Sequence, residues 1–205
     1  MFALSPASAQ NGKVYSSITI HDGYTSDDGK TWIVSDVLYS STFDEKIETL
    51  VLVLQDYEKY PQIFSRLRST EIVAYDTKRA QIRQNYEVRA AGFSFPSECL
   101  LQLSVEAEAM PRTWKQSWVM VSSDGSVKDL QGYWLLESVD GLDGKNTTRV
   151  SYRNLGAVLK RFPLQVTIMR MLSENEYART FSALAKECAR RAESSVQISS
   201  GAALN

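Results

Sequence analysis

The spacing of hydrophobic residues changes along the chain. From about residue 70 to residue 156 polar and apolar side chains alternate, which is typical of β-strands that bury one face. Residues 164–193 instead repeat apolar side chains at intervals of three and four, with Met169, Phe181 and Leu184 on one side, which predicts a long amphipathic helix. Such a helix must cover another element, and the alternating strands are its available partner. We therefore predict an α+β fold: a curved antiparallel β-sheet of about six or seven strands wrapped around a long C-terminal α-helix.

Two β-strands and a helix are predicted before the alternating region. Residues 14–41 contain two stretches rich in β-branched and aromatic side chains, joined by a loop with two Asp-Gly steps, which predicts an extra N-terminal β-hairpin strand. Thr42 and Glu45 have the spacing of a capping box, so a helix is expected to begin there. Pro61 lacks a backbone N–H and is expected to end that helix.

Length and composition fit one globular domain. The chain has 205 residues, of which 43% are hydrophobic and 23% charged, close to the average of globular proteins. No apolar stretch approaches the ~20 residues with which a helix crosses a bilayer. We expect residues 13–193 to form the folded domain and residues 194–205, which are small and polar, to form a disordered tail.

The first residues have two interpretations. Residues 1–12 are expected either to form a disordered tail or to be the remnant of a secretory signal peptide. The second interpretation rests on Ala7-Ser8-Ala9, which has the small-residue spacing of a cleavage site. It favours an exported or periplasmic protein, whereas the first leaves a cytoplasmic one.

Charge and scarce residues argue against several functional classes. The formal net charge is −1, which gives no reason to expect a nucleic-acid partner. His21, expected in a surface turn, is the one histidine, and Cys99 and Cys188 are the two cysteines, too few for a clustered zinc site. The glycine-rich patterns of nucleotide-binding loops are missing. We expect no metal and no cofactor, and we expect both cysteines to be buried free thiols.

The alternating strands place large aromatic side chains and a few amides on one inward face. Gln116 lies between Trp114 and Trp118 on that face, which also holds Gln84 and Asn154. A buried amide costs about 1–3 kcal/mol unless it is hydrogen-bonded. The aromatic residues either fill the core completely or line a cavity whose amides orient a hydrophobic ligand. On the second interpretation the predicted ligand-binding residues are Tyr86, Leu103, Trp114, Gln116, Trp118, Trp134, Tyr152, Met169 and Leu172.

One segment carries a resemblance to a known superfamily. The sequence VLVLQDYEKYPQIFSRLRSTEIV at residues 51–73 resembles the first helix and second strand of START-like, helix-grip proteins. Its features are an aliphatic helix that ends in Asp56-Tyr57, followed by Tyr60-Pro61. The strands GYWLLESV and TTRVSYRNL and the closing helix also resemble the superfamily, so the similarity covers roughly residues 31–193. The branch that the sequence resembles most is the coenzyme-Q-binding and polyketide-cyclase/dehydrase group.

The resemblance implies a deep cavity between the sheet and the last helix that holds a hydrophobic ligand. It transfers no shared catalytic motif, so it implies no catalytic residue. Asp56, Tyr57 and Pro61 are implied to be structural, because they turn the chain from helix to strand.

A basic region follows the strands and includes a candidate gate. Residues 145–191 contain ten Lys and Arg against three Glu, a local excess of seven positive charges. Within it, the loop predicted over residues 155–163 is apolar with two adjacent cations, and the resemblance places that loop at the cavity mouth. The loop either opens the cavity and makes transient contact with an anionic membrane, or its cations merely solvate the helix. The candidate gate or membrane-contact residues are Val158, Leu159, Lys160, Arg161 and Phe162.

These observations leave three functions open. The first is non-enzymatic binding or transport of a hydrophobic small molecule, such as a lipid, a quinone or an isoprenoid-like compound. The second is a polyketide cyclase/dehydrase-type enzyme that uses the same cavity, and the third is a protein-interaction module whose cavity is filled. General acid–base catalysis needs a titrating group in the cavity, and the predicted inward face has no carboxylate and no histidine. The sequence therefore favours binding over catalysis.

Overall fold

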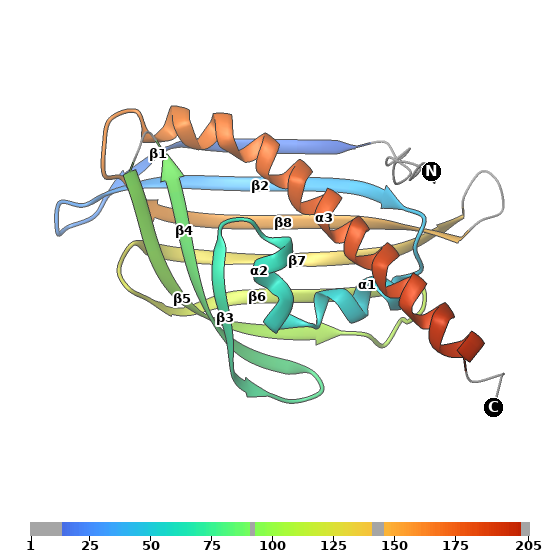
Figure 1. The fold of residues 1–205 in the computed structure, drawn as a ribbon. Coiled ribbons are helices and arrows are strands. Elements are labelled where there is room, and N and C mark those ends of the chain that lie inside the picture. Colours follow the sequence, from blue (N-terminus) through green and yellow to red (C-terminus); the bar gives the residue numbers. More distant parts are fainter. Residues whose placement is uncertain (1–13, 91–92, 141–145, 202–205) are drawn as a thin grey trace.

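A single antiparallel sheet and a long helix across one of its faces form the molecule (Figure 1). The computed structural model describes residues 14–90, 93–140 and 146–201, so the N-terminal fragment that suggested a signal peptide lies outside the described residues. The strands are β1 (Tyr15–Thr25), β2 (Thr31–Phe43), β3 (Leu67–Tyr75), β4 (Arg79–Ala90), β5 (Phe93–Glu106), β6 (Thr113–Ser123), β7 (Val127–Asp140) and β8 (Asn146–Leu159). The helices are α1 (Ile47–Leu54), the 3-10 helix η1 (Tyr57–Lys59), α2 (Tyr60–Ile63) and α3 (Gln165–Gly201).

The strands are arranged in the order β1-β2-β8-β7-β6-β5-β4-β3, and each neighbouring pair is antiparallel. Strand β8 therefore joins the N-terminal hairpin to the rest of the sheet. The described residues form eight strands rather than the predicted six or seven. The predicted antiparallel sheet, long C-terminal helix and additional N-terminal strand are confirmed.

The predicted capping box is wrong. Thr42 lies within β2, opposite Arg149 of β8. Helix α1 begins only after Lys46, which makes no side-chain capping bond, and the burial of Leu50 and Leu54 stabilises it instead. Pro61 does not end this helix but occupies the first turn of α2, where a missing backbone N–H costs no hydrogen bond.

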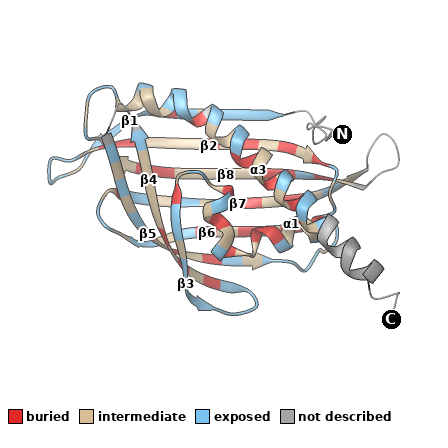
Figure 2. Cartoon of the chain, in the orientation of Figure 1, coloured by how far each residue is buried: buried red, intermediate tan, exposed pale blue. Residues whose placement is uncertain are grey.

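Helix α3 is tightly packed against α1 and the sheet over residues 181–191. Phe181, Leu184 and Cys188 are fully buried there, and Figure 2 shows buried positions of α1 beneath the helix. The Arg191 guanidinium contacts Asp56 at 2.6 Å and Glu187 at 2.8 Å, which ties α3 to the end of α1. Helix α3 continues to Gly201, beyond the domain end predicted at residue 193, and residues 202–205 of the predicted tail lie outside the described residues.

The two cysteines and the single histidine lie in three different elements of the fold. Cys99 and Cys188 are buried free thiols, as predicted, and burial raises the pKa of each to about 12. His21 is exposed as expected, but it lies within β1 rather than in a turn.

Candidate ligand cavity

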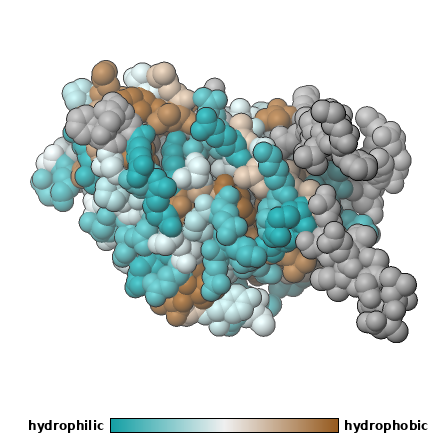
Figure 3. All heavy atoms as spheres, viewed as in Figure 1, coloured by the Kyte–Doolittle hydropathy of each residue, from teal (hydrophilic) through white to brown (hydrophobic). Residues whose placement is uncertain are grey.

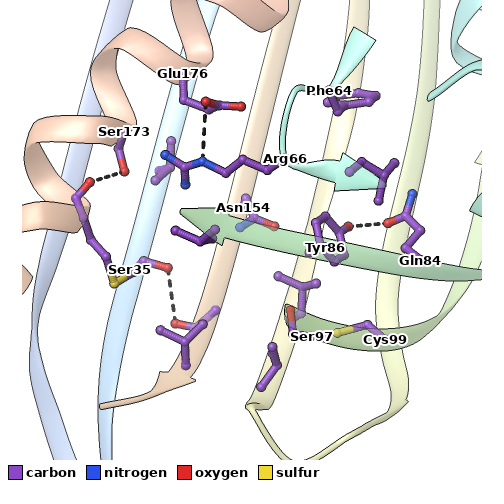
Figure 4. Close-up of a pocket in the computed structure, with 18 of the residues that line it drawn as sticks. Ser35, Phe64, Arg66, Gln84, Tyr86, Ser97, Cys99, Asn154, Ser173 and Glu176 are labelled. Carbon is purple, nitrogen blue, oxygen red and sulfur yellow. Dashed lines mark hydrogen bonds and ion pairs between the residues drawn. The ribbon is translucent and has the colours of Figure 1, made fainter. Parts of the chain in front are cut away.

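A cavity of about 320 Å³ lies between the inner face of the sheet and the N-terminal half of α3 (Figure 4). Strands β4 to β8 supply most of its wall, and α3 closes it with Met169, Leu172, Ser173 and Tyr177. The lining is mostly apolar and aromatic, with few polar groups. Its volume falls within the range of about 300–1,000 Å³ that is usual for small-molecule sites.

Eight of the nine predicted ligand-binding residues border this cavity. The Trp118 ring stacks on the Tyr152 ring with 5.5 Å between their centroids. The centroid of the Trp134 ring lies 4.6 Å from that of Tyr152. The three aromatic rings therefore form a continuous rigid wall. The cavity-lining residues of the predicted set are Tyr86, Leu103, Gln116, Trp118, Trp134, Tyr152, Met169 and Leu172.

Trp114 is the exception. Its side chain is 1% exposed and therefore points to the inward face of the sheet, as predicted. It does not, however, line the cavity. Trp114 lies four residues before Trp118 on β6, a separation of roughly 13 Å along a strand. Helix α1 packs on β6 and β7 at that end of the sheet, and Trp114 belongs to the core there.

The buried amide of Gln116 is held by two tyrosines. Its Nε2 donates to Tyr57 Oη at 2.6 Å, and its Oε1 accepts from Tyr60 Oη at 3.3 Å. Tyr60 Oη also donates to the carbonyl oxygen of Leu54 at 2.5 Å. These bonds offset the cost of burying Gln116 and connect α1, η1 and α2 to β6. Tyr57 therefore has a structural contact, consistent with the role implied by the resemblance.

A charged pair, Arg66 and Glu176, also lines the cavity, and strand alternation did not predict it. Arg66 Nε lies 3.4 Å from Glu176 Oε2, and Ser65 Oγ donates to Glu176 Oε1 at 2.6 Å. The expectation of a cavity without a carboxylate is therefore wrong. Arg66 lies in the short connection between α2 and β3 and belongs to no periodic pattern. Glu176 was detectable, because it lies three residues after Ser173 and so on the same face of α3.

Phenol groups supply further polar atoms to the cavity. Burial raises the pKa of Tyr86 and of Tyr152 well above the ordinary value, and it raises the pKa of Tyr177 to about 12. All three phenols are therefore neutral at physiological pH and act as hydrogen-bond partners rather than bases. The Tyr86 hydroxyl donates to Gln84 Oε1, as drawn in Figure 4.

The connection between β8 and α3 is shorter than the gate predicted over residues 155–163. Strand β8 continues to Leu159, and Val158 pairs with both Ile33 of β2 and Val127 of β7. Gly156 is buried in the same strand, so it provides no flexible hinge. The connection between β8 and α3 is thus residues 160–164, and movement of residues 155–159 would break the sheet.

The five candidate gate residues have different surroundings. Val158, Leu159, Arg161 and Phe162 border the cavity, whereas Lys160 points away and contacts Asp22 Oδ1 at 2.7 Å. The Phe162 ring stacks on Phe95 of β5 with 5.5 Å between centroids. This stack joins the connection after β8 to the first residues of β5 and closes one end of the cavity.

The described residues contain no group of three or more side chains placed to hold a metal ion. Among the same residues, no helix is both long enough and apolar enough to span a bilayer.

Comparison with known proteins identifies the fold of this chain and does not identify its function. No protein-family model and no curated protein sequence matches the chain. Among solved structures, the ZhuI aromatase/cyclase from Streptomyces sp. R1128 is similar with a TM-score of 0.60 and 14% identity, covering 78% of this chain and 96% of that one. The STAR-related lipid transfer protein from Xanthomonas axonopodis has a TM-score of 0.60 at 13% identity, covering 83% and 98%. Human StAR-related lipid transfer protein 5 has a TM-score of 0.60 at 11% identity, covering 90% and 88%.

This chain has the helix-grip fold. The resemblance seen in the sequence is confirmed at that level. The solved structures that share this fold include lipid transfer proteins and an aromatase/cyclase. Coenzyme Q binding stays a prediction.

Proposed function

We propose that the protein binds one hydrophobic small molecule in the cavity beneath α3 and carries it without changing it chemically. The observation that carries this proposal is the cavity itself, about 320 Å³ of mostly apolar space in the interior of the domain. An apolar cavity with a few placed polar groups is the usual form of a site for such molecules. Lipids, quinones and isoprenoid-like compounds are the candidate classes. The open cavity also argues against an interaction module with a filled interior.

A cyclase-type enzyme is the second candidate, because a carboxylate does line the cavity. Glu176 is, however, already engaged at both oxygens, by Arg66 and by Ser65. The tyrosines around it are neutral at physiological pH, so they are poor bases. We therefore favour binding. Turnover of a polyketide-like substrate that is lost in Glu176→Gln would support the enzyme instead.

We infer that the ligand exchanges at the end of the cavity closed by Phe162. Residues 161–164 lie outside every strand pair, and the Phe162 ring in this connection stacks on Phe95. Exposed apolar side chains also lie at this end: Leu164 is 67% exposed and Met171 is 70% exposed. Figure 3 shows the hydrophobic area over the N-terminal part of α3. These features support transient contact with a membrane during exchange.

A cavity-filling variant tests the proposal. Ser97 of β5 faces the cavity (Figure 4), so Ser97→Phe places a ring in the space without removing any wall. Ser104→Phe on the same strand is the matched control, because Ser104 is exposed. The emission of Nile red, a neutral hydrophobic dye, is titrated with each protein. We expect the parent and Ser104→Phe to bind the dye and Ser97→Phe to lose most of this binding. Equal binding by all three proteins would contradict the proposal.

A further inference from the structure

The cavity has one polar end, and its charges are unbalanced. Among the described residues that line the cavity, the charged ones are Arg66, Arg161 and Glu176, which gives the lining one excess positive charge. Arg66 and Glu176 lie opposite each other, on the α2–β3 connection and on α3, and Figure 4 shows the guanidinium reaching toward the carboxylate. A positive excess inside an otherwise apolar cavity favours a ligand that carries a negative charge.

The Arg66 guanidinium is only partly engaged. Its Nε faces Glu176 Oε2 at 3.4 Å, and the guanidinium makes no hydrogen bond with any described residue. Its side chain retains 30% exposure. A guanidinium presents its donors in a planar fork that matches a carboxylate at two points, so the terminal nitrogens can bind a ligand carboxylate while Nε keeps its internal partner.

Neutral donors surround the same position. The side chains of Asn154, Tyr152 and Tyr177 line the cavity and make no hydrogen bond with another described residue. The Tyr152 and Tyr177 rings lie 5.5 Å apart between centroids, and Tyr177 directly follows Glu176, the partner of Arg66. The one carboxylate present, Glu176, is already used by Arg66 and Ser65. This end of the cavity therefore offers amide, phenol and guanidinium donors that have no acceptor among the described residues, and a ligand carboxylate can supply the acceptor atoms.

We propose that Arg66 selects hydrophobic ligands that end in a single carboxylate, which its terminal nitrogens bind while the apolar body lies against the Trp118–Tyr152–Trp134 wall. This inference rests on the proposed function and narrows it to a ligand class. Glu176 has the opposite effect on the same ligand: it orients Arg66 but repels the incoming carboxylate.

Three probes of equal chain length separate the polar group from the apolar body. Dodecanoate, methyl dodecanoate and dodecanol are tested as competitors of Nile red with the parent protein. We expect dodecanoate to bind about ten- to a hundredfold more tightly than the other two, the range expected for a hydrogen-bonded charge pair. Equal affinity for all three would overturn the role of Arg66 and leave the proposed function standing. Failure of all three to compete while Nile red binds in the cavity would overturn the carboxylate class as well.

Variants of Arg66 and Glu176 test which residue causes the preference for dodecanoate. Arg66→Gln should weaken dodecanoate binding by about ten- to a hundredfold and change dodecanol binding by less than about threefold. Arg68→Gln is the matched control, because Arg68 is exposed on β3 and does not line the cavity, and it should preserve the preference for dodecanoate. Glu176→Gln should strengthen dodecanoate binding, which a purely structural ion pair does not predict.

Because Arg66→Gln leaves Glu176 without its partner, the double variant Arg66→Gln/Glu176→Gln is measured alongside it, with thermal unfolding of each. The double variant has no unpaired charge, and it should bind dodecanol and dodecanoate equally. A double variant that folds and still prefers dodecanoate would overturn the proposal.

Discussion

Helix α3 covers two regions of the same sheet that differ in how they are filled. Over residues 181–191, Phe181, Leu184 and Cys188 are fully buried against α1 and the sheet, and Arg191 ties the helix to Asp56. We refer to this as the packed region. At its N-terminal half, the same helix lies over the cavity and contributes polar side chains such as Ser173 and Glu176 to its lining. We refer to this as the cavity region.

The packed region is filled because helix α1 forms an additional layer on the sheet there. Both regions have aromatic side chains on the inward face of β6, Trp114 in the packed region and Trp118 in the cavity region. Helix α1 packs on β6 and β7 beside Trp114, whereas α3 and Tyr60 of α2 border the cavity region without filling it. An inward aromatic residue is thus core or cavity wall according to what covers it.

The largest expected effect distinguishes the two tryptophans directly. Trp114→Ala should lower the free energy of unfolding by about 3–5 kcal/mol, because it removes a large side chain from a closed core. Trp118→Ala should cost clearly less, because its ring already borders empty space, and it should weaken Nile red binding. Urea unfolding and dye titration measure both quantities. Equal destabilisation with unchanged dye binding would remove the distinction between the regions.

The next effect tests how the cavity wall is built. A Cβ at Gly132 would lie 2.1 Å from the carbonyl oxygen of Arg153 and 2.5 Å from the Trp118 ring, so only glycine lets that ring lie against β7. Gly132→Ala should cost about 1–3 kcal/mol or more and push Trp118 into the cavity, which reduces dye binding.

Gly156→Ala is the matched control for Gly132→Ala. A Cβ at Gly156 meets its nearest neighbours at 3.4 Å, an ordinary contact. A Gly132→Ala protein as stable as Gly156→Ala would show that the Trp118 ring is placed differently.

A smaller effect concerns pH and the packed region. Hydrogen bonds from Arg190 and Arg191 lower the pKa of Glu187 from 4.5 to about 2. A pKa that is lower in the folded state stabilises the fold above the ordinary pKa, and this stabilisation is lost as the pH falls toward about 2. The parent should therefore lose more stability on acidification than Glu187→Gln does, measured by urea unfolding at a series of pH values. Identical acid dependence would show that the Glu187 contacts do not stabilise the packed region.

The smallest expected effect concerns the cavity end closed by Phe162. Arg161→Glu should slow ligand transfer to anionic vesicles several-fold, because it reverses a charge near the mouth, where each charge contributes about 1 kcal/mol. Lys160 is a poor target, because it pairs with Asp22. Lys78→Glu is the control, since Lys78 lies in the exposed turn between β3 and β4. Transfer rates that do not depend on vesicle charge or on Arg161 would exclude this electrostatic contact.

The sequence predicted the inward face well and the boundaries of elements poorly. Alternation places Gln116, Trp118 and Trp134 correctly, because a strand allows only two directions for a side chain. The same argument cannot tell Trp114 from Trp118, since the covering helix comes from elsewhere in the chain. The end of β8 was placed too early, because residues 155–159 pair on both sides and are apolar without alternation, as is usual for strands buried on both faces.

The polar end of the cavity was the main feature that the sequence did not reveal. Arg66 lies in a short connection without periodicity, and only the fold brings it to Glu176, 110 residues further along the chain and 3.4 Å away. Glu176 has the spacing of the cavity face of α3, but a single charged residue on a long helix is usually solvent-exposed. Contacts between distant connections and helices therefore decide the chemistry of this site.

The central claim is that the interior of the cavity region holds a hydrophobic molecule. The most direct test is mass spectrometry of small molecules extracted from purified parent protein, from Ser97→Phe and from Ser104→Phe. The account predicts one hydrophobic species, present in near-equimolar amount in the parent and in Ser104→Phe and depleted in Ser97→Phe. A parent protein that carries no such species after expression, and binds no hydrophobic probe afterwards, would contradict it, as would the same species at equal amount in all three proteins.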